Sequence, residues 1–180
     1  MKNYRDSMAI RANHYDAAVE EYLRSLRVPY VAVDEKRRAL FGDDSLKSLD
    51  FIIDAPRRGL LVDVKGRRFG GSAGAWENWA TDDDIVSMTH WQTVFGDRFR
   101  AALVFAYWLD QTAAVPVGYD PFEWGGRRYV FAVARVDDYA ALMKERSASW
   151  GTVTVRRAEF RQIHQPLHEL FDVDFDVDAA

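Results

Sequence analysis

The sequence predicts an α/β fold in which a mixed central β-sheet is flanked by helices. Its periodic segments follow the order helix, three strands, second helix and further strands, which is the order of a layered α/β core. Residues 13–27 repeat apolar side chains at spacings of three and four, the period of an amphipathic helix. Residues 101–110 are apolar on both faces, as expected of a central strand that helices cover on both sides.

Length, composition and charge exclude several classes of protein. Its 180 residues fit one domain, 1–180, that buries about 70% of its unfolded surface. The absence of cysteine excludes disulfides and cysteine-ligated zinc, and the net charge of -4 argues against a protein that coats nucleic acid non-specifically. The first residues lack the apolar core of a signal peptide, and the longest apolar run, 101–109, is shorter than a membrane span. We therefore expect a cytoplasmic protein with no membrane partner.

Residues 49–68, LDFIIDAPRRGLLVDVKGRR, are predicted to form a hairpin at the centre of the fold. The turn carries a proline and a glycine, and both flanking runs are rich in Ile, Leu and Val. Because side chains alternate along a strand, Asp63 and Lys65 share one face of the second strand, and Asp50 stands among apolar residues of the first. Charges at such positions cost free energy unless they are paired or bind a metal ion.

These three charged residues suit metal-assisted hydrolysis of a phosphodiester. Paired antiparallel strands lie about 4.8 Å apart, so Asp50 and Asp63 can share one small cation if the register brings them level. Mg²⁺ accepts one or two carboxylates and keeps waters for chemistry. Lys65 lies roughly 7 Å along the strand from Asp63. Its side chain is long enough to reach a metal-bound water. Lys65 would then be the further donor that the reaction needs beside the nucleophile.

Asp50, followed after twelve residues by DVK at 63–65, resembles the signature of the PD-(D/E)xK nucleases. Leu49 stands where that signature often has a proline. A second acid-x-Lys triplet, DEK at 34–36, has no acid on an apolar strand about a dozen residues upstream and continues into two arginines. We therefore expect that second triplet to be a solvated strand end.

The resemblance implies a restriction-endonuclease-like fold and a Mg²⁺-dependent nuclease, with Mn²⁺ as a substitute ion. It implies that Asp50 and Asp63 bind the metal ion, and that Lys65 positions or activates water or stabilises the transition state. Because an unperturbed lysine has a pKa of about 10.4, a role as general base would require burial to lower it. DNA is expected as the partner ahead of RNA, and the oligomeric state stays open, with a homodimer as one option. The alternative is a non-catalytic module on the same fold that binds nucleic acid or protein.

The predicted helix at 13–27 offers a third acid for the site. Asn13 is an acceptable N-cap, and the superfamily often takes one glutamate from the helix before its first strand. Residues 14–20, HYDAAVE, resemble the opening of the HYExAFE family of bacterial proteins, which marks Glu20. Helical periodicity alone does not choose between Glu20 and Glu21, and an exposed helical acid is the alternative for either.

Five further residues are candidates for contact with nucleic acid. Four arginines flank the proposed site, with solvated turn positions as the alternative. Thr81 is the predicted cap of the second helix, with Asp84 near the capping-box acid position, and Gly96 closes it. Gln92 lies on the apolar face of this helix, and satisfaction by backbone groups is its alternative. The four arginines are Arg57, Arg58, Arg67 and Arg68.

The other segments complete the expected sheet. The terminus, 171–180, is expected to be an acidic edge strand or tail. The remaining pattern predicts strands at 30–40, 128–136 and 150–155, a helix at 137–146, and loops at 66–74 and 113–126.

Overall fold

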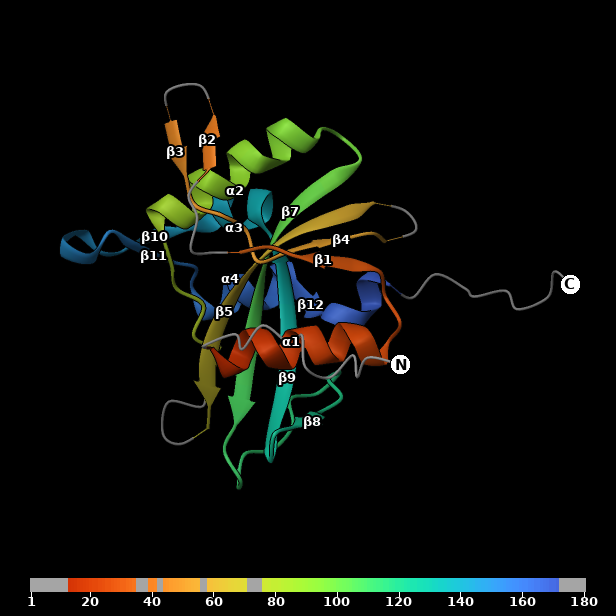
Figure 1. Cartoon of the computed structure of the whole chain (residues 1–180). Helices are drawn as coiled ribbons and strands as arrows, with labels where there is room; N and C mark the ends of the chain where they lie inside the picture. The colour runs from red at the N-terminus through yellow and green to blue at the C-terminus, as the bar shows by residue number, and fades with distance from the viewer. Residues whose placement is uncertain (1–12, 35–38, 42–43, 56–57, 71–75, 172–180) are drawn as a thin grey trace, which may run out of the picture.

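A mixed β-sheet forms the centre of the structure, a computed structural model that describes residues 13–34, 39–41, 44–55, 58–70 and 76–171. β5 and β7 are parallel, and the other neighbouring strands in this sheet are antiparallel. The strand order is β1 (Tyr30–Ala32), β4 (Phe51–Ile53), β5 (Gly59–Phe69), β7 (Phe99–Leu109), β9 (Arg127–Arg135) and β12 (His164–Pro166), with β8 (Phe122–Trp124) paired to β9 (Figure 1).

The two parallel strands at the centre are the longest elements of the sheet. β5 and β7 pair over eleven residues each, from Gly59 opposite Phe99 to Phe69 opposite Leu109. Residues 101–107 of β7 are all buried, which confirms the prediction of a central strand with both faces covered.

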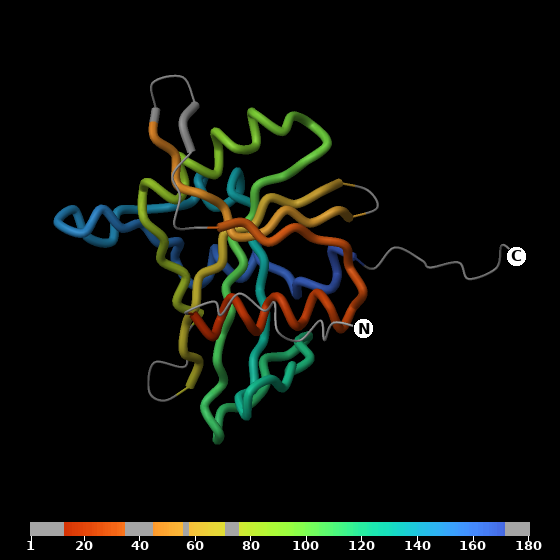
Figure 2. Tube along the Cα trace, viewed as in Figure 1, coloured from red at the N-terminus to blue at the C-terminus, as the bar shows by residue number. Residues whose placement is uncertain are grey.

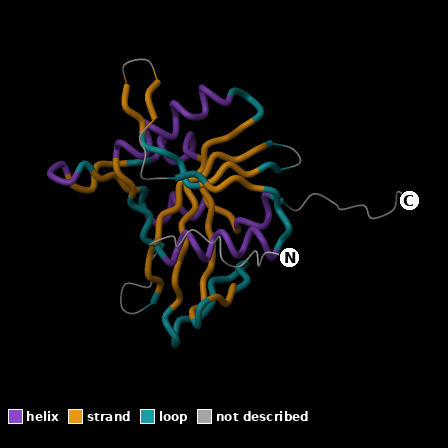
Figure 3. Tube along the Cα trace, viewed as in Figure 1, coloured by secondary structure: helices purple, strands orange, loops and turns teal. Residues whose placement is uncertain are grey.

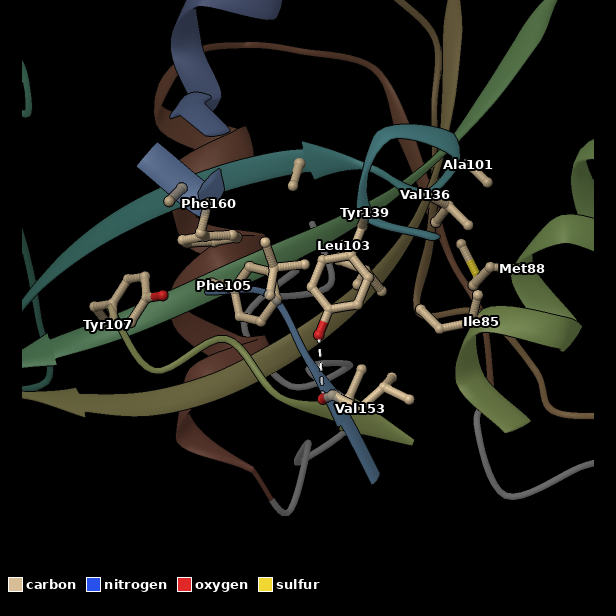
Figure 4. Packing of buried hydrophobic residues seen from close by; sticks show 14 of the residues in the cluster. Ile85, Met88, Ala101, Leu103, Phe105, Tyr107, Val136, Tyr139, Val153 and Phe160 are labelled. Carbon is tan, nitrogen blue, oxygen red and sulfur yellow. Dashed lines mark hydrogen bonds between the residues drawn. The ribbon is translucent and has the colours of Figure 1, made fainter. Parts of the chain in front are cut away.

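Helices cover the two faces of the sheet and bury a separate apolar cluster on each (Figures 1 and 3). On one face, α1 (His14–Ser25) packs Val19 and Leu23 against β4, β5 and β7. On the other face, α2 (Asp82–Phe95), α3 (Val136–Leu142) and α4 (Arg157–Ile163) pack against β7 and β9. Figure 4 shows Met88, Tyr139 and Phe160 of these helices around Leu103 and Phe105 of β7. The helix–sheet–helix arrangement confirms the predicted α/β class.

Local capping explains where the two longer helices begin and end. The Asn13 side chain accepts a hydrogen bond from the backbone N–H of Tyr15, so α1 starts where predicted. Thr81 and Asp84 form a reciprocal capping box at the start of α2, and Gly96 with a φ of 72° closes it. Among the described residues, no helix is both long enough and apolar enough to cross a membrane.

The single strand predicted at 30–40 was wrong. β1 ends at Ala32, and β2 (Ala39–Phe41) pairs instead with β3 (Asp44–Leu46) in a separate two-stranded sheet. The apolar alternation stops at Asp34, so the following charged run offers no buried face to a sheet. Residues 35–38 lie outside the described part of the chain.

The loop predicted at 66–74 was also wrong over its first residues, because β5 continues to Phe69. A Cβ atom at Gly66 would lie 2.1 Å from the ring of Tyr15 on α1. The glycine at this position therefore permits close helix–sheet packing rather than loop mobility. Residues 71–75 lie outside the described residues.

The helix predicted at 137–146 ends at Leu142, where a hairpin begins. β10 (Lys144–Ser147), the 3₁₀ turn η3 (Ala148–Trp150) and β11 (Thr152–Thr154) form this hairpin, which projects from the body of the molecule (Figure 2). β11 also pairs with β6 (Ala80–Thr81). The 3₁₀ turn η4 (Leu167–Leu170) follows β12. The predicted loop at 113–126 contains β8, and most of the predicted tail, 172–180, lies outside the described residues.

Candidate active site

The hairpin of β4 and β5 brings Asp50 and Asp63 side by side. Phe51 pairs with Val62 in the antiparallel register, so the next residues outward, Asp50 and Asp63, are level. The two carboxyl groups are within hydrogen-bonding reach of each other. Oδ2 of Asp50 also accepts a hydrogen bond of 2.6 Å from the backbone N–H of Val64, which fixes its orientation.

Lys65 forms ion pairs with two carboxylates at the same place. Its Nζ lies 2.6 Å from Oδ2 of Asp63 and 2.9 Å from Oδ2 of Asp84. The side chains of Lys65, Asp63 and Asp84 are 15%, 14% and 7% exposed. Because water screens these charges little, the pairs are stronger than ordinary surface ion pairs.

Asp84 connects the site to the start of α2. Its Oδ2 accepts a hydrogen bond from the backbone N–H of Thr81, and its Oδ1 accepts one of 2.8 Å from Nζ of Lys47. One carboxylate thus caps a helix and contacts two lysines, so it ties α2 to the hairpin.

These groups line a cavity of about 370 Å³. Its wall holds four carboxylates and two ammonium groups from α1, the segment before β4, strand β5 and helix α2. The lining residues are Asn13, Asp16, Lys47, Ser48, Asp50, Asp63, Val64, Lys65 and Asp84.

The pKa shifts in the cavity differ in direction from one group to the next. Burial is the largest effect on Asp63 and raises its pKa; Lys65 offsets part of this rise, and the nearby Asp84 adds to it. Burial acts to lower the pKa of Lys65, but Asp63 and Asp84 outweigh it and raise that pKa. Burial opposes ionisation of Asp84, yet Lys65, Lys47 and the N–H of Thr81 hold its pKa well below the usual range. Lys65 is therefore a cation at neutral pH, and Asp63 takes up a proton before Asp84 does.

Comparisons with known proteins place this geometry in a known fold. No family model and no curated protein matches the chain. Among solved structures, it is similar to the Holliday junction resolvase Hjc of Archaeoglobus fulgidus, with a TM-score of 0.52 and 12% sequence identity over 87% of this chain and 97% of that chain. The fold is restriction-endonuclease-like.

The predicted resemblance to the PD-(D/E)xK nucleases thus has support at the level of the fold. No comparison confirms the narrower resemblance to the HYExAFE family.

Glu20 does not line the cavity of this restriction-endonuclease-like core. Its Oε1 accepts hydrogen bonds from Arg24, at 2.8 Å, and from the hydroxyl of Tyr30, at 2.9 Å. Asp16, one turn earlier on α1, lines the cavity instead and is only 2% exposed. The two acids are four residues apart, so the start of α1 reaches the cavity and its second turn does not.

A sequence signal for Asp16 was present. Asp16 precedes Val19 by three residues and Leu23 by seven, so helical periodicity places it on the buried side of α1. An acid on that stripe requires a polar environment. The sequence analysis did not list Asp16, Lys47 or Asp84 as site residues, and Asp84 was identified only as a capping residue.

Of the arginines expected beside the site, the three that the structure describes do not line the cavity. Arg67 is buried, donates hydrogen bonds to the carbonyls of Gly66 and Trp79, and stacks 3.8 Å from the Trp79 ring. Arg68 points to the opposite face of the strand and pairs with Asp110 at 2.7 Å. Arg58 is exposed beside the hairpin turn, and Arg57 lies outside the described residues.

Gln92 is held by contacts within the protein. Its Oε1 accepts a hydrogen bond of 2.8 Å from the backbone N–H of Ala101, and its Nε2 donates to Asp137. The backbone contact is the alternative that the sequence analysis left open, and Gln92 does not line the cavity.

The ligand chemistry of the cavity suits a hard divalent cation. Its acidic oxygens come from aspartates, and neither histidine nor cysteine lines it. Burial, and after it the charge of Asp84, raise the pKa of Asp63, and a bound cation would favour the ionised carboxylate against both effects. Within the described ranges, no three His, Cys, Asp or Glu side chains are grouped tightly enough to hold a metal ion together. Asp50 and Asp63 lie side by side in the cavity, and two carboxylates are a number that Mg²⁺ commonly uses.

Proposed function

We propose that this chain is a Mg²⁺-dependent nuclease that hydrolyses phosphodiester bonds of DNA, with Asp50, Asp63 and Lys65 at its catalytic centre. The observation that carries the proposal is the convergence of these three side chains from adjacent strands in one cavity. The restriction-endonuclease-like fold supports it, and the similarity to a Holliday junction resolvase favours DNA over RNA.

Asp50 and Asp63 would hold the metal ion, which when bound activates water and offsets charge on the phosphate. The backbone N–H of Val64 donates a hydrogen bond to Oδ2 of Asp50 and so fixes the orientation of this carboxylate toward Asp63. Asp16 also lines the cavity, and in this proposal it takes the role that the family resemblance implied for Glu20.

Lys65 acts as a cation rather than as a base in this proposal. Asp63 and Asp84 raise its pKa against the opposing effect of burial, so its ammonium group keeps its proton at neutral pH. A protonated amine next to the reacting phosphate stabilises the negative charge that grows in the transition state. Asp84 is a positioning residue, since it holds Lys65 from the side of α2.

The ion pairs also give a specific reason to consider a non-catalytic binding module. Lys65 is shared between Asp63 and Asp84, and Asp84 is shared between Lys65 and Lys47. A cluster with its charges balanced in this way can serve as a structural element of the core. The two functions differ in whether the cavity binds metal and supports cleavage.

The decisive assay incubates the chain with single-stranded, duplex and branched DNA and with RNA, each in Mg²⁺, Mn²⁺ or chelator. We expect metal-dependent cleavage of DNA that Asp63→Asn abolishes. The control is Asp54→Asn, because Asp54 lies on the same hairpin but is exposed and pairs with Arg98. Binding of DNA without cleavage of any substrate in either metal would overturn the nuclease proposal in favour of the binding module.

A further inference from the structure

The projecting hairpin formed by β10, η3 and β11 carries an exposed aromatic residue, and the segment from the hairpin into α4 carries a surplus of positive charge. Figures 2 and 3 show it extending away from the sheet, with a helical turn at its tip. Trp150 in that turn is 79% exposed. Residues 144–161 contain five Lys and Arg residues and two Glu residues, although the whole chain has a net charge of -4. Local charge of this sign on an acidic protein favours a polyanionic partner.

Trp79, at the base of the hairpin, lies between two guanidinium groups. The guanidinium carbon of Arg67 is 3.8 Å from the centroid of the Trp79 ring, and that of Arg146 on β10 is 5.3 Å from it. Arg67 is buried and Arg146 is exposed, so this stack runs from the sheet to the surface. Alternating aromatic and cationic groups suit bases and phosphates along one strand.

Two cavities meet at this stack. The first, of about 260 Å³, includes Glu77, Asn78 and Arg157 in its wall. The second, of about 390 Å³, is lined by Trp79, Arg146, Ser147, Trp150 and Thr152. Trp79 and Arg146 belong to both walls. The second cavity therefore offers two indole rings and one guanidinium group to a planar ligand.

The hairpin is attached directly to the proposed catalytic centre. Thr152 of β11 pairs with Thr81 of β6, and the backbone N–H of Thr81 donates a hydrogen bond to Asp84. On β5, Lys65 and Arg67 point to the same face and are roughly 7 Å apart along the strand. A single oligonucleotide can therefore contact the catalytic cavity and the hairpin together.

We propose that the cavity between Trp79 and Trp150 binds an unpaired base of single-stranded DNA, with Arg146 contacting the adjoining phosphate. This inference rests on the proposed nuclease function and assigns it a substrate class, DNA with an unpaired segment beside the cleaved bond. In a blunt duplex, stacked bases cannot enter the cavity, so the hairpin contributes little to duplex binding.

The test measures binding of fluorescein-labelled oligothymidylate, and of the same strand annealed to oligoadenylate, by anisotropy. All chains carry Asp63→Asn to prevent cleavage. Trp150→Ala is expected to weaken binding of the single strand about tenfold, the loss that removal of one base-stacking aromatic residue gives. Arg146→Ala is expected to weaken it by a similar factor, and the duplex affinity should change less than about twofold in both variants.

Matched controls lie on other parts of the surface. Arg98→Ala removes an exposed arginine near the β4–β5 turn, and Val117→Ala alters a fully exposed apolar residue in the loop before β8. Both control variants should bind the single strand as tightly as the parent chain. Circular dichroism of each variant checks that the hairpin substitutions leave the fold intact.

The possible failures are distinguishable. If Trp150→Ala and Arg146→Ala bind the single strand like the parent, the hairpin proposal is overturned, whatever the cleavage assay shows. Equal losses for single strand and duplex also overturn it, because they indicate general phosphate contact. If the parent binds neither probe, the hairpin proposal fails, and the nuclease proposal is decided separately by the cleavage assay.

Discussion

The ammonium group of Lys65 lies 2.6 Å from Oδ2 of Asp63, two residues earlier on the same strand. This contact follows from the alternation of side chains along β5, which points both residues to one face. Their side chains are 15% and 14% exposed, so the contact is close to solvent but weakly screened by it. The pair is the core of the proposed catalytic centre, and several predictions depend on the environment of its two members.

Replacing Lys65 should separate catalysis from metal binding. Lys65→Met keeps the length of the side chain but removes the charge, and we expect cleavage to fall at least about a hundredfold because transition-state charge is no longer stabilised. Asp50 and Asp63 remain, so calorimetry should still detect Mg²⁺ binding. Unchanged single-turnover cleavage in this variant would show that Lys65 has no catalytic role.

Two acids of α1 provide a matched comparison. Asp16→Asn should reduce cleavage about tenfold or more, since Asp16 lines the cavity. Glu20→Gln should change it less than about twofold, because Glu20 contacts Arg24 and Tyr30 outside the cavity. The opposite order in a cleavage assay would restore Glu20 as the third acid of the site.

Asp84 should stabilise the fold at neutral pH. Its pKa is held below the ordinary 3.8, so its stabilisation is present above that value and is lost as the pH falls through the lowered pKa. Asp84→Asn should lower the free energy of unfolding by about 2 kcal/mol through loss of the helix cap and of the paired charge.

Urea denaturation at pH 7 measures this loss. Asp82→Asn serves as the control, because Asp82 is exposed in the same helical turn and should cost little. Equal stability of the Asp82 and Asp84 variants would contradict the role given to the Asp84 contacts.

As the pH is lowered, metal affinity should begin to fall at a higher pH than it would at an ordinary carboxylate site. Burial and Asp84 raise the pKa of Asp63 above its ordinary value of 3.8, so protonation removes a metal ligand at a higher pH. A titration with Mn²⁺ at several pH values should show this loss of affinity begin above the ordinary carboxyl range. Affinity that stays constant down to pH 3.8 would be inconsistent with the raised pKa.

Substitution of Gly66 tests the packing that places α1 against the site. An added Cβ would lie 2.1 Å from the Tyr15 ring, so Gly66→Ala should destabilise the chain by about 1–3 kcal/mol. In the double variant with Tyr15→Ala, the two effects should be less than additive, because the smaller side chain removes the clash. Full additivity in urea denaturation would argue against direct contact.

Local sequence patterns predicted much of the fold. The alternation around Asp63, the capping residues Thr81 and Asp84, and the doubly buried strand at 101–110 each depend on neighbours in the chain. Those features were confirmed in the structure. The strand at 30–40 and the loop at 66–74 were wrong because their outcome depends on burial and on packing against α1, which short patterns do not encode.

The site was predictable only where its residues share a strand or a hairpin. Asp50 and Asp63 are brought together by one turn, and Lys65 follows on the same face. Lys47 and Asp84 meet across 37 positions, and their contact depends on how α2 docks against the hairpin. The contact between Trp79 and Arg146 was not predicted for the same reason, since the two residues are far apart in sequence.

Calorimetric titration of Mg²⁺ into the unaltered chain and into Asp50→Asn, Asp63→Asn and Asp54→Asn tests the central claim most directly. The account predicts one saturable binding event in the unaltered chain and in Asp54→Asn, and none in the Asp50 and Asp63 variants. Mg²⁺ binding that is absent from the unaltered chain, or that persists in both cavity variants, would contradict it.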